Sequence, residues 1–155
     1  MSRMDIDGAC LCGHVTYEAT IDADRIAICH CTDCQINSGT AFRYAVMVPR
    51  EDFRLLTGTL KVFVKTAENG NQRALSFCPE CGTSIHGGAV GDSPSFSLRL
   101  GTARQRTELR PTMQIWCRSR LDWVGEIGDM REIHEQGRPR QASGTGAVVT
   151  DSRQG

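Results

Sequence analysis

The stretch Cys78-Pro79-Glu80-Cys81-Gly82 is the most specific local pattern in this chain of 155 residues. Its C-x-x-C spacing is that of the tight knuckles of zinc ribbons. The proline presets the turn, and the final glycine lets backbone amides approach and donate hydrogen bonds to the sulfur atoms. The pattern therefore predicts that both thiols bind one zinc ion.

A second cysteine pair lies near the N-terminus, in Cys10-Leu11-Cys12-Gly13. Residues two apart in an extended segment point to the same face, so both thiols can reach one ion where the chain bends at Gly13. The two pairs together supply the four thiolates of a complete tetrahedral shell, with Zn–S bonds of about 2.3 Å. We expect a structural zinc held by Cys10, Cys12, Cys78 and Cys81. Buried free cysteines or a disulfide are the alternatives.

The remaining cluster, Cys29-His30-Cys31-Thr32-Asp33-Cys34, offers three thiolates from one short segment. Three protein ligands with an open fourth position are typical of a catalytic or substrate-binding zinc. Zinc is a borderline-soft acid, so a thiolate is a natural fourth ligand, and binding lowers the pKa of that thiol. The run predicts a second, catalytic zinc on Cys29, Cys31 and Cys34 that binds a thiol substrate.

Other interpretations of this cluster stay open. They are an empty site, a redox pair that forms a disulfide while the metal leaves, and a second structural zinc completed by a histidine. His30 lies between two of the ligands and should point to the opposite face. His14 and His86 are other possible fourth ligands, but each is expected to be a polar strand residue. Cys117 has no neighbouring cysteine and is expected to be a small buried apolar side chain.

Charge and composition narrow the class of protein. The 18 lysines and arginines balance the 18 aspartates and glutamates, so we expect no nucleic-acid partner and no membrane partner. Met1 to Gly8 lacks the apolar run of a secretion signal, and no segment is apolar for long enough to span a bilayer. We expect a cytoplasmic protein. Eight cysteines in such a reducing compartment favour metal binding or thiol chemistry over disulfides.

Short runs in which apolar and polar residues alternate predict half-buried β-strands. The expected strands lie in Val15–Ala19, Phe42–Val46, Leu60–Val64, Arg73–Phe77, Ser95–Leu100 and Thr112–Cys117. Many short strands at close intervals favour an all-β sandwich or a folded sheet, and we expect a mainly β protein of folded antiparallel sheets. Helical segments are expected only in Cys31–Asn37 and Pro49–Leu56. We expect one domain over residues 1–136 and a flexible C-terminal tail over residues 137–155, where little can be buried.

Read in order, these motifs resemble the glutathione-dependent formaldehyde-activating enzyme family, which also includes centromere protein V. The resemblance runs from about Gly8 to Val124. It rests on Gly8-Ala9-Cys10-Leu11-Cys12-Gly13, Cys29 to Cys34 with Ser38-Gly39, Val48-Pro49 with Phe53 and Gly58, Phe77 to Thr83, and Trp123 after Arg118 and Arg120.

The resemblance implies an Mss4-like fold with the structural and catalytic zinc ions on the cysteines grouped above. It also implies a carbon–sulfur lyase activity, in which glutathione adds to formaldehyde to give S-hydroxymethylglutathione. Family members often carry a histidine where this chain has Gln114, and glutamine cannot shuttle protons. A non-catalytic zinc-binding module or thiol carrier is the alternative function. The arginines in the second half of the chain could meet the carboxylates of glutathione, namely Arg99, Arg104, Arg106, Arg110, Arg118 and Arg120.

Overall fold

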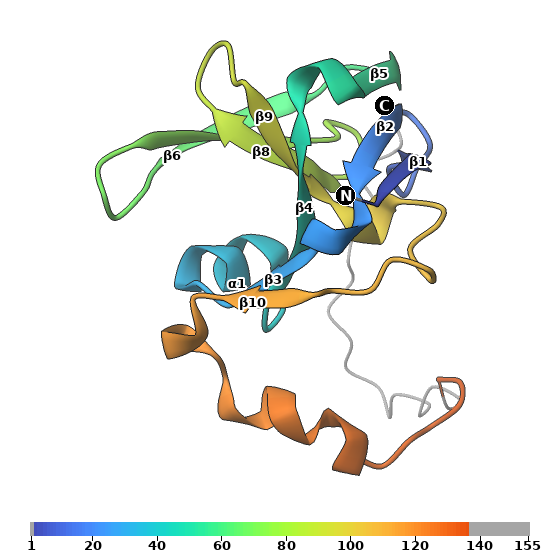
Figure 1. Ribbon diagram of the computed structural model, residues 1–155, viewed down its shortest axis with the longest axis vertical. Helices are drawn as coiled ribbons and strands as arrows, with labels where there is room; N and C mark the ends of the chain where they lie inside the picture. The colour runs from blue at the N-terminus through green and yellow to red at the C-terminus, as the bar shows by residue number, and fades with distance from the viewer. Residues whose placement is uncertain (1, 137–155) are drawn as a thin grey trace, which may run out of the picture. The chain divides into compact units, whose positions relative to one another are not determined.

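The computed structural model describes residues 2–136, which form two β-sheets, one α-helix and several short 3-10 helices (Figure 1). The smaller sheet has the strand order β1-β2-β5. Its strands are β1 (Arg3–Ala9), β2 (Thr16–Asp22) and β5 (Phe53–Thr57). Both of its strand pairs are antiparallel. The expected C-terminal tail, residues 137–155, lies outside the described residues.

The larger sheet has seven strands in the order β10-β3-β4-β9-β8-β7-β6. They are β3 (Ala27–Cys29), β4 (Arg43–Pro49), β6 (Lys61–Thr66), β7 (Gln72–Phe77), β8 (Ser84–Ala89), β9 (Ser95–Arg99) and β10 (Met113–Ile115). Neighbouring strands are antiparallel except β10 and β3, which are parallel. The prediction of a mainly β fold is confirmed, with one parallel pair added to the antiparallel sheets.

The single α-helix, α1 (Thr32–Ser38), directly follows β3 and carries part of the second cysteine group. Cys31 is its N-cap, and Gly39 ends it in the left-handed conformation with φ 68°. The 3-10 helices are η1 (Ala23–Arg25), η2 (Arg50–Asp52), η3 (Leu100–Thr102), η4 (Cys117–Ser119) and η5 (Asp122–Asp129). Within residues 2–136, no helix combines the length and the apolar composition that a bilayer-spanning segment requires.

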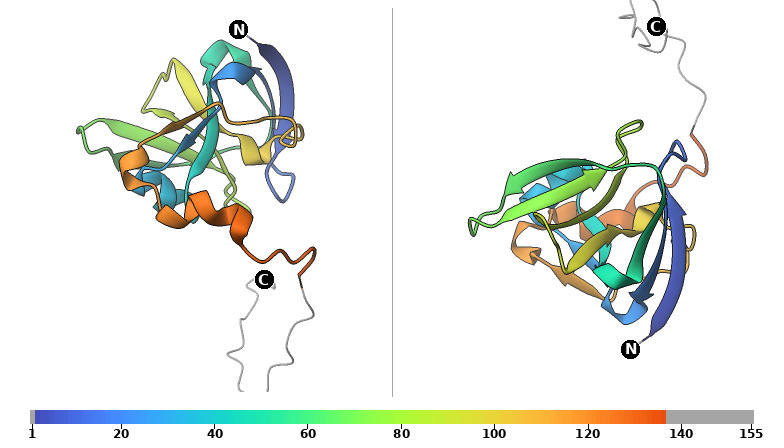
Figure 2. Two further views of the ribbon diagram at one scale, coloured as in Figure 1. Left: turned by 60° about the horizontal axis from the view of Figure 1, so that its bottom comes forward. Right: turned by 90° about the horizontal axis from the view of Figure 1, so that it is seen from above.

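The chain divides into two compact units, one up to Val124 and one from Gly125 onward. Both sheets, α1 and all eight cysteines belong to the first unit. Its core joins apolar side chains of both sheets, including Tyr17 from β2, Val46 from β4 and Leu98 from β9. Burying a leucine or valine of this kind contributes about 1.5–3 kcal/mol. Figures 1 and 2 show the β6–β7 hairpin extending away from the smaller sheet.

The prediction of a helical segment at Pro49–Leu56 is wrong. The structure has the short helix η2 there and then strand β5, which pairs with β2 so that Phe53 lies opposite Ala19. Phe53 also stacks on Tyr17 of β2, with ring centroids 5.5 Å apart. The free edge of β2 and this aromatic contact outweigh the local helical pattern, because strand propensity depends on what the strand packs against.

Strand β6 is more exposed than its alternating pattern predicts. Val62 and Val64 are 51% and 43% exposed, because β6 is the last strand of the larger sheet. At the opposite end of that sheet, the expected strand Thr112–Cys117 is shortened to β10. Trp116 has a positive φ of 57°, which ends the extended conformation.

Candidate functional site

The first cysteine group lies where the two sheets meet. Cys10 and Cys12 occupy the turn between β1 and β2, and Cys78 and Cys81 occupy the turn between β7 and β8. All four sulfur atoms lie within 4.8 Å of one another, with Cys10 and Cys12 at 3.6 Å and Cys12 and Cys78 at 3.8 Å. A tetrahedral ion with bonds of about 2.3 Å holds its sulfurs about 3.8 Å apart, whereas a disulfide bond is about 2.0 Å long. This group can therefore hold a metal ion between the two sheets.

Each turn of this group closes in the same way. Gly13 and Gly82 have φ of 80° and 76°, which a side chain would disfavour. Their N–H groups donate to the carbonyl oxygens of Cys10 and Cys78. The N–H of Val15 donates to the Cys10 sulfur at 3.2 Å, and such donors favour the thiolate form. The glycines therefore form the tight turns that the motifs predict.

The second group gathers the sulfur atoms of Cys29, Cys31 and Cys34. Cys29 ends β3 and is buried, while Cys31 and Cys34 lie at the start of α1. All three sulfurs lie within 4.8 Å of one another, and Cys29 and Cys34 are 3.5 Å apart. Within residues 2–136, no histidine or carboxylate joins this group at that distance. It can hold a metal ion through three protein ligands, which leaves one coordination position open.

Both groups contain thiols that are biased toward the thiolate, because the pKa values of Cys10 and Cys81 in the first group and of Cys29 in the second are lowered. A hydrogen bond from the Thr83 hydroxyl and then backbone N–H groups lower the pKa of Cys81 to about 5. A hydrogen bond from Cys34 lowers the pKa of Cys29 to about 5, against the opposing effect of burial. The same hydrogen bond raises the pKa of Cys34, which keeps its proton. Because metals bind thiolates, both groups have the chemistry of metal sites.

None of the histidines considered as a fourth ligand joins the group, and His14 lies in an exposed bend between β1 and β2 instead of in the expected strand. His30 is fully buried, and its Nε2–H donates to the side-chain oxygen of Gln114 at 2.9 Å. His86 is a buried residue of β8 whose ring stacks on Phe96, with centroids 4.2 Å apart. Burial lowers the pKa of His86 to about 4, with a smaller contribution from the charge of Arg99. Both rings therefore belong to the interior of the domain.

Cys117 is not the buried apolar residue that the sequence predicts. It is exposed, because the left-handed conformation of Trp116 turns the chain out of β10 into the surface helix η4.

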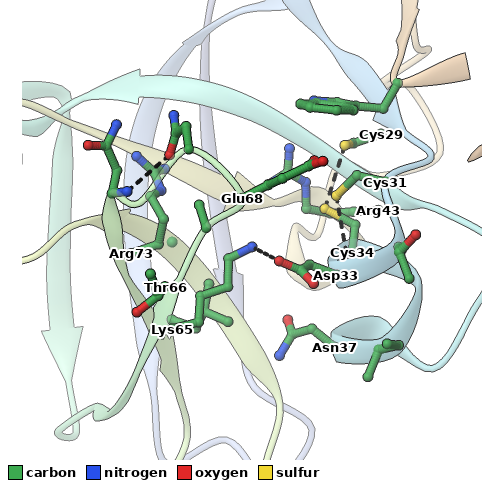
Figure 3. Close-up of a pocket in the computed structure, with 18 of the residues that line it drawn as sticks. Cys29, Cys31, Asp33, Cys34, Asn37, Arg43, Lys65, Thr66, Glu68 and Arg73 are labelled. Atoms are coloured by element: carbon green, nitrogen blue, oxygen red, sulfur yellow. Dashed lines mark hydrogen bonds and ion pairs between the residues drawn. The ribbon is translucent and has the colours of Figure 1, made fainter. Parts of the chain in front are cut away.

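A cavity of about 1240 Å³ opens beside the three-cysteine group (Figure 3). Part of its lining comes from one face of the larger sheet. Cys29 of β3 lies opposite Arg43 of β4, and Gly87 of β8 lies opposite Leu75 of β7. Residues paired across antiparallel strands share a face, as do residues two apart along a strand. All four line the cavity, so the sheet face continues from the cysteines toward the β6–β7 hairpin.

Three arginines from different strands line this cavity, namely Arg43, Arg73 and Arg99. Burial and then the charges of Arg43 and Arg73 lower the pKa of Arg99 to about 10. The Nη1 of Arg99 donates to the carbonyl and hydroxyl oxygens of Ser97, both at 3.1 Å. The buried Nε of Arg43 has no hydrogen-bond partner. The sequence grouped Arg99 with five other arginines of the second half of the chain, and it gave no sign that Arg43 and Arg73 line the same cavity.

The other charged residues of the cavity lining are already paired. Lys65 of β6 forms an ion pair with Asp33 of α1. Arg118 lies 3.2 Å from Glu68 and also covers the ring of Trp116, 4.8 Å from its centroid. Asp33 and Glu68 are the acidic residues of the lining, so no lining carboxylate is left for the three arginines.

Comparisons with known proteins agree with this arrangement. Residues 5–119 match the family model described as glutathione-dependent formaldehyde-activating enzyme, and this match ends before Trp123. The fold is similar to the crystal structure of a Rhodobacter sphaeroides protein, with TM-score 0.54 and 17% sequence identity. That likeness covers 70% of this chain and 98% of the other. The comparison with curated proteins gives no match. The chain belongs to the glutathione-dependent formaldehyde-activating enzyme family.

Proposed function

We propose that this protein binds glutathione or a similar small thiol at Cys29, Cys31 and Cys34 and adds it to formaldehyde or another small carbonyl compound. It would act as a carbon–sulfur lyase of the S-(hydroxymethyl)glutathione synthase type, with one catalytic and one structural zinc ion. The observation that carries the proposal is the group of three sulfurs beside a large cavity, with no fourth protein ligand. A reducing compartment, which we expect to be the cytoplasm, keeps these thiols available.

A zinc ion on this group would supply a Lewis acid that lowers the pKa of the thiol taken as fourth ligand. The chain itself fixes the three ligands at the end of β3 and the start of α1. In the reaction the glutathione sulfur bonds to the carbonyl carbon and the C=O π bond breaks. The thiol proton ends on the new hydroxyl oxygen. Rate acceleration would come mainly from holding the two reactants together.

Gln114 has a positioning role in this proposal. Its side-chain oxygen accepts the hydrogen bond of His30, the residue between Cys29 and Cys31. Neither Gln114 nor His30 lines the cavity, so we assign no proton transfer to this pair. Instead, the hydrogen bond orients the short segment that carries the first two cysteines.

The reaction is tested by exchange NMR with ¹³C-formaldehyde and glutathione, which measures how fast free and adduct carbon interconvert. The zinc-loaded protein should accelerate exchange above the uncatalysed rate. Cys31→Ser should abolish the acceleration, and Cys117→Ser, which changes an exposed cysteine outside both groups, should keep it. Glutathione binding with no acceleration for any carbonyl compound would instead identify a thiol carrier. Loss of metal on mild oxidation, with a new Cys29–Cys34 disulfide, would support a redox role.

A further inference from the structure

We propose that Arg43, Arg73 and Arg99 form a carboxylate-binding subsite, so that the preferred thiol carries negative charge away from its sulfur atom. The inference rests on the proposed function, because it names the class of thiol that the three-cysteine site takes. The experiment that tests it distinguishes binding of the ligand through its sulfur atom from binding through its carboxylates.

The sheet register brings the arginines into one row that starts at the cysteines. Arg43 is paired with Cys29 across β3 and β4, and Arg99 is paired with Ala45, two residues along from Arg43. Arg73 is two residues from Leu75, which is paired with Gly87. All of these residues share one face of the sheet. In Figure 3, Arg43 lies next to the three sulfurs and Arg73 lies at the far side of the cavity.

The positive charge of this row has no carboxylate counterion among the described residues. Within residues 2–136, no carboxylate forms an ion pair with Arg43, Arg73 or Arg99. A Zn²⁺ ion with three thiolates carries one negative charge, which leaves a surplus of two positive charges beside the site. Partly buried like charges repel one another and cost stability unless an anion binds between them. Arginine is also the side chain best suited to bind a carboxylate through two parallel hydrogen bonds.

Glutathione matches this surplus. As a thiolate it carries three negative groups and one ammonium group, so its net charge balances the two remaining positive charges. Cysteamine, which has no carboxylate, would leave the arginines unpaired. The distance also favours an extended thiol. Four strand spacings of about 4.8 Å separate β3 from β7, so a ligand with its sulfur at Cys29 must be of peptide length to reach Arg73.

Gly87 keeps the centre of this row open. A Cβ atom at this position would lie 3.3 Å from Nη2 of Arg99 and 3.2 Å from the Leu75 side chain. Both contacts are tighter than usual, so alanine would displace the guanidinium or the ligand beside it. Gly87 does not have a positive φ, so its backbone conformation does not require glycine. We infer that the missing side chain leaves space for the Arg99 guanidinium and a ligand.

The test uses the zinc-loaded protein and isothermal titration with three ligands. Glutathione carries both the thiol and the carboxylates. Its diethyl ester keeps the thiol and neutralises both carboxylates, and the peptide γ-Glu-Ala-Gly keeps the carboxylates and lacks the thiol. Each ligand is titrated into the wild type and into Arg99→Gln, Arg73→Gln and Arg54→Gln. Arg54 pairs with Glu18 on the smaller sheet and controls for net charge. Zinc content and melting temperature are measured for every variant.

The wild type should bind glutathione about ten- to a hundredfold more tightly than its diethyl ester. Arg99→Gln and Arg73→Gln should remove most of this preference and should weaken the binding of γ-Glu-Ala-Gly in parallel. Arg54→Gln should leave both the preference and the affinity for γ-Glu-Ala-Gly unchanged. If Arg99→Gln does not fold, Arg73→Gln decides. Equal binding of glutathione and its diester would overturn the subsite and leave the thiol site standing. Equal binding of glutathione and γ-Glu-Ala-Gly, both weakened by the arginine variants, would support the subsite and overturn thiol binding at the metal.

Discussion

The substitutions Cys78→Ser and Cys31→Ser should differ widely in their effect on stability. Cys78 is fully buried in the turn between β7 and β8, where it meets the two cysteines from the β1–β2 turn. Loss of its thiolate would remove one of the four ligands that can join the two sheets through a metal ion. Cys31 borders the cavity, and its side chain caps α1 by accepting the N–H of Cys34. Serine is an equally good N-cap, so Cys31→Ser keeps the helix while removing one metal ligand.

The expected magnitudes differ widely. Structural zinc in small modules contributes about 10–16 kcal/mol of binding free energy, which is also folding free energy. A domain of this kind has a net stability of only about 5–15 kcal/mol. Losing the ion between the sheets should therefore unfold the first unit at ordinary temperature. Exchanging the Cys31 cap for a serine cap should change the unfolding free energy by less than about 1 kcal/mol.

Thermal melts followed by circular dichroism, with zinc content measured on the same samples, check this prediction. Cys78→Ser should show no cooperative transition and should lack the ion of the four-cysteine group. Cys31→Ser should melt within a few degrees of the wild type. An equal loss of stability in both variants would refute the reasoning, because it would make the three-cysteine group structural as well.

Three further outcomes are expected. Because the pKa of His86 is depressed in the folded protein, the unfolded chain binds more protons as the pH falls from about 6.5 to 4, and the free energy of unfolding drops by up to about 3 kcal/mol. His86→Phe should flatten this part of the curve of unfolding free energy against pH. Gly8→Ala should lower the free energy of unfolding in urea by about 1–3 kcal/mol, because a Cβ there would clash with the Thr102 carbonyl and the Tyr17 ring. The control Gly101→Ala should leave it unchanged, because the space around Gly101 is open. Gel-shift titration should show no tight binding of duplex DNA at physiological salt, because the net charge is zero and the unpaired arginines line a cavity.

The two cysteine groups could be predicted from sequence because each motif is local. Spacing and the following glycines define the knuckles at Cys10 and Cys78, and the three-thiolate run lies within six residues. Most strands were also predicted, since alternation reports a half-buried face. Strands β1, β3 and β8 are not among the expected strands, and in β8 Gly87 and Gly88 interrupt the apolar pattern. The local pattern indicates a helix where the structure has β5, because the pairing of β5 with β2 is not local.

The arginine row could not be predicted, because it depends on the order and register of the strands. Arg43, Arg73 and Arg99 come from β4, β7 and β9, and only the sheet order β4-β9-β8-β7 places them on one surface. The sequence instead grouped arginines that are close along the chain. Of those, Arg104 forms an ion pair with Asp7 and Arg118 forms one with Glu68. Closeness in sequence was therefore a poor guide to which charges are left unpaired.

Cobalt substitution gives the most direct measurement of the central claim, that a thiol binds to the metal held by Cys29, Cys31 and Cys34. Thiolate-to-cobalt charge-transfer bands should grow when glutathione is added and should not grow with S-methyl glutathione. The growth should vanish in Cys34→Ser and persist in Cys117→Ser, because Cys117 is exposed and belongs to neither cysteine group. A spectrum that shows cobalt on the three cysteines and ignores every thiol offered would contradict the proposed mechanism.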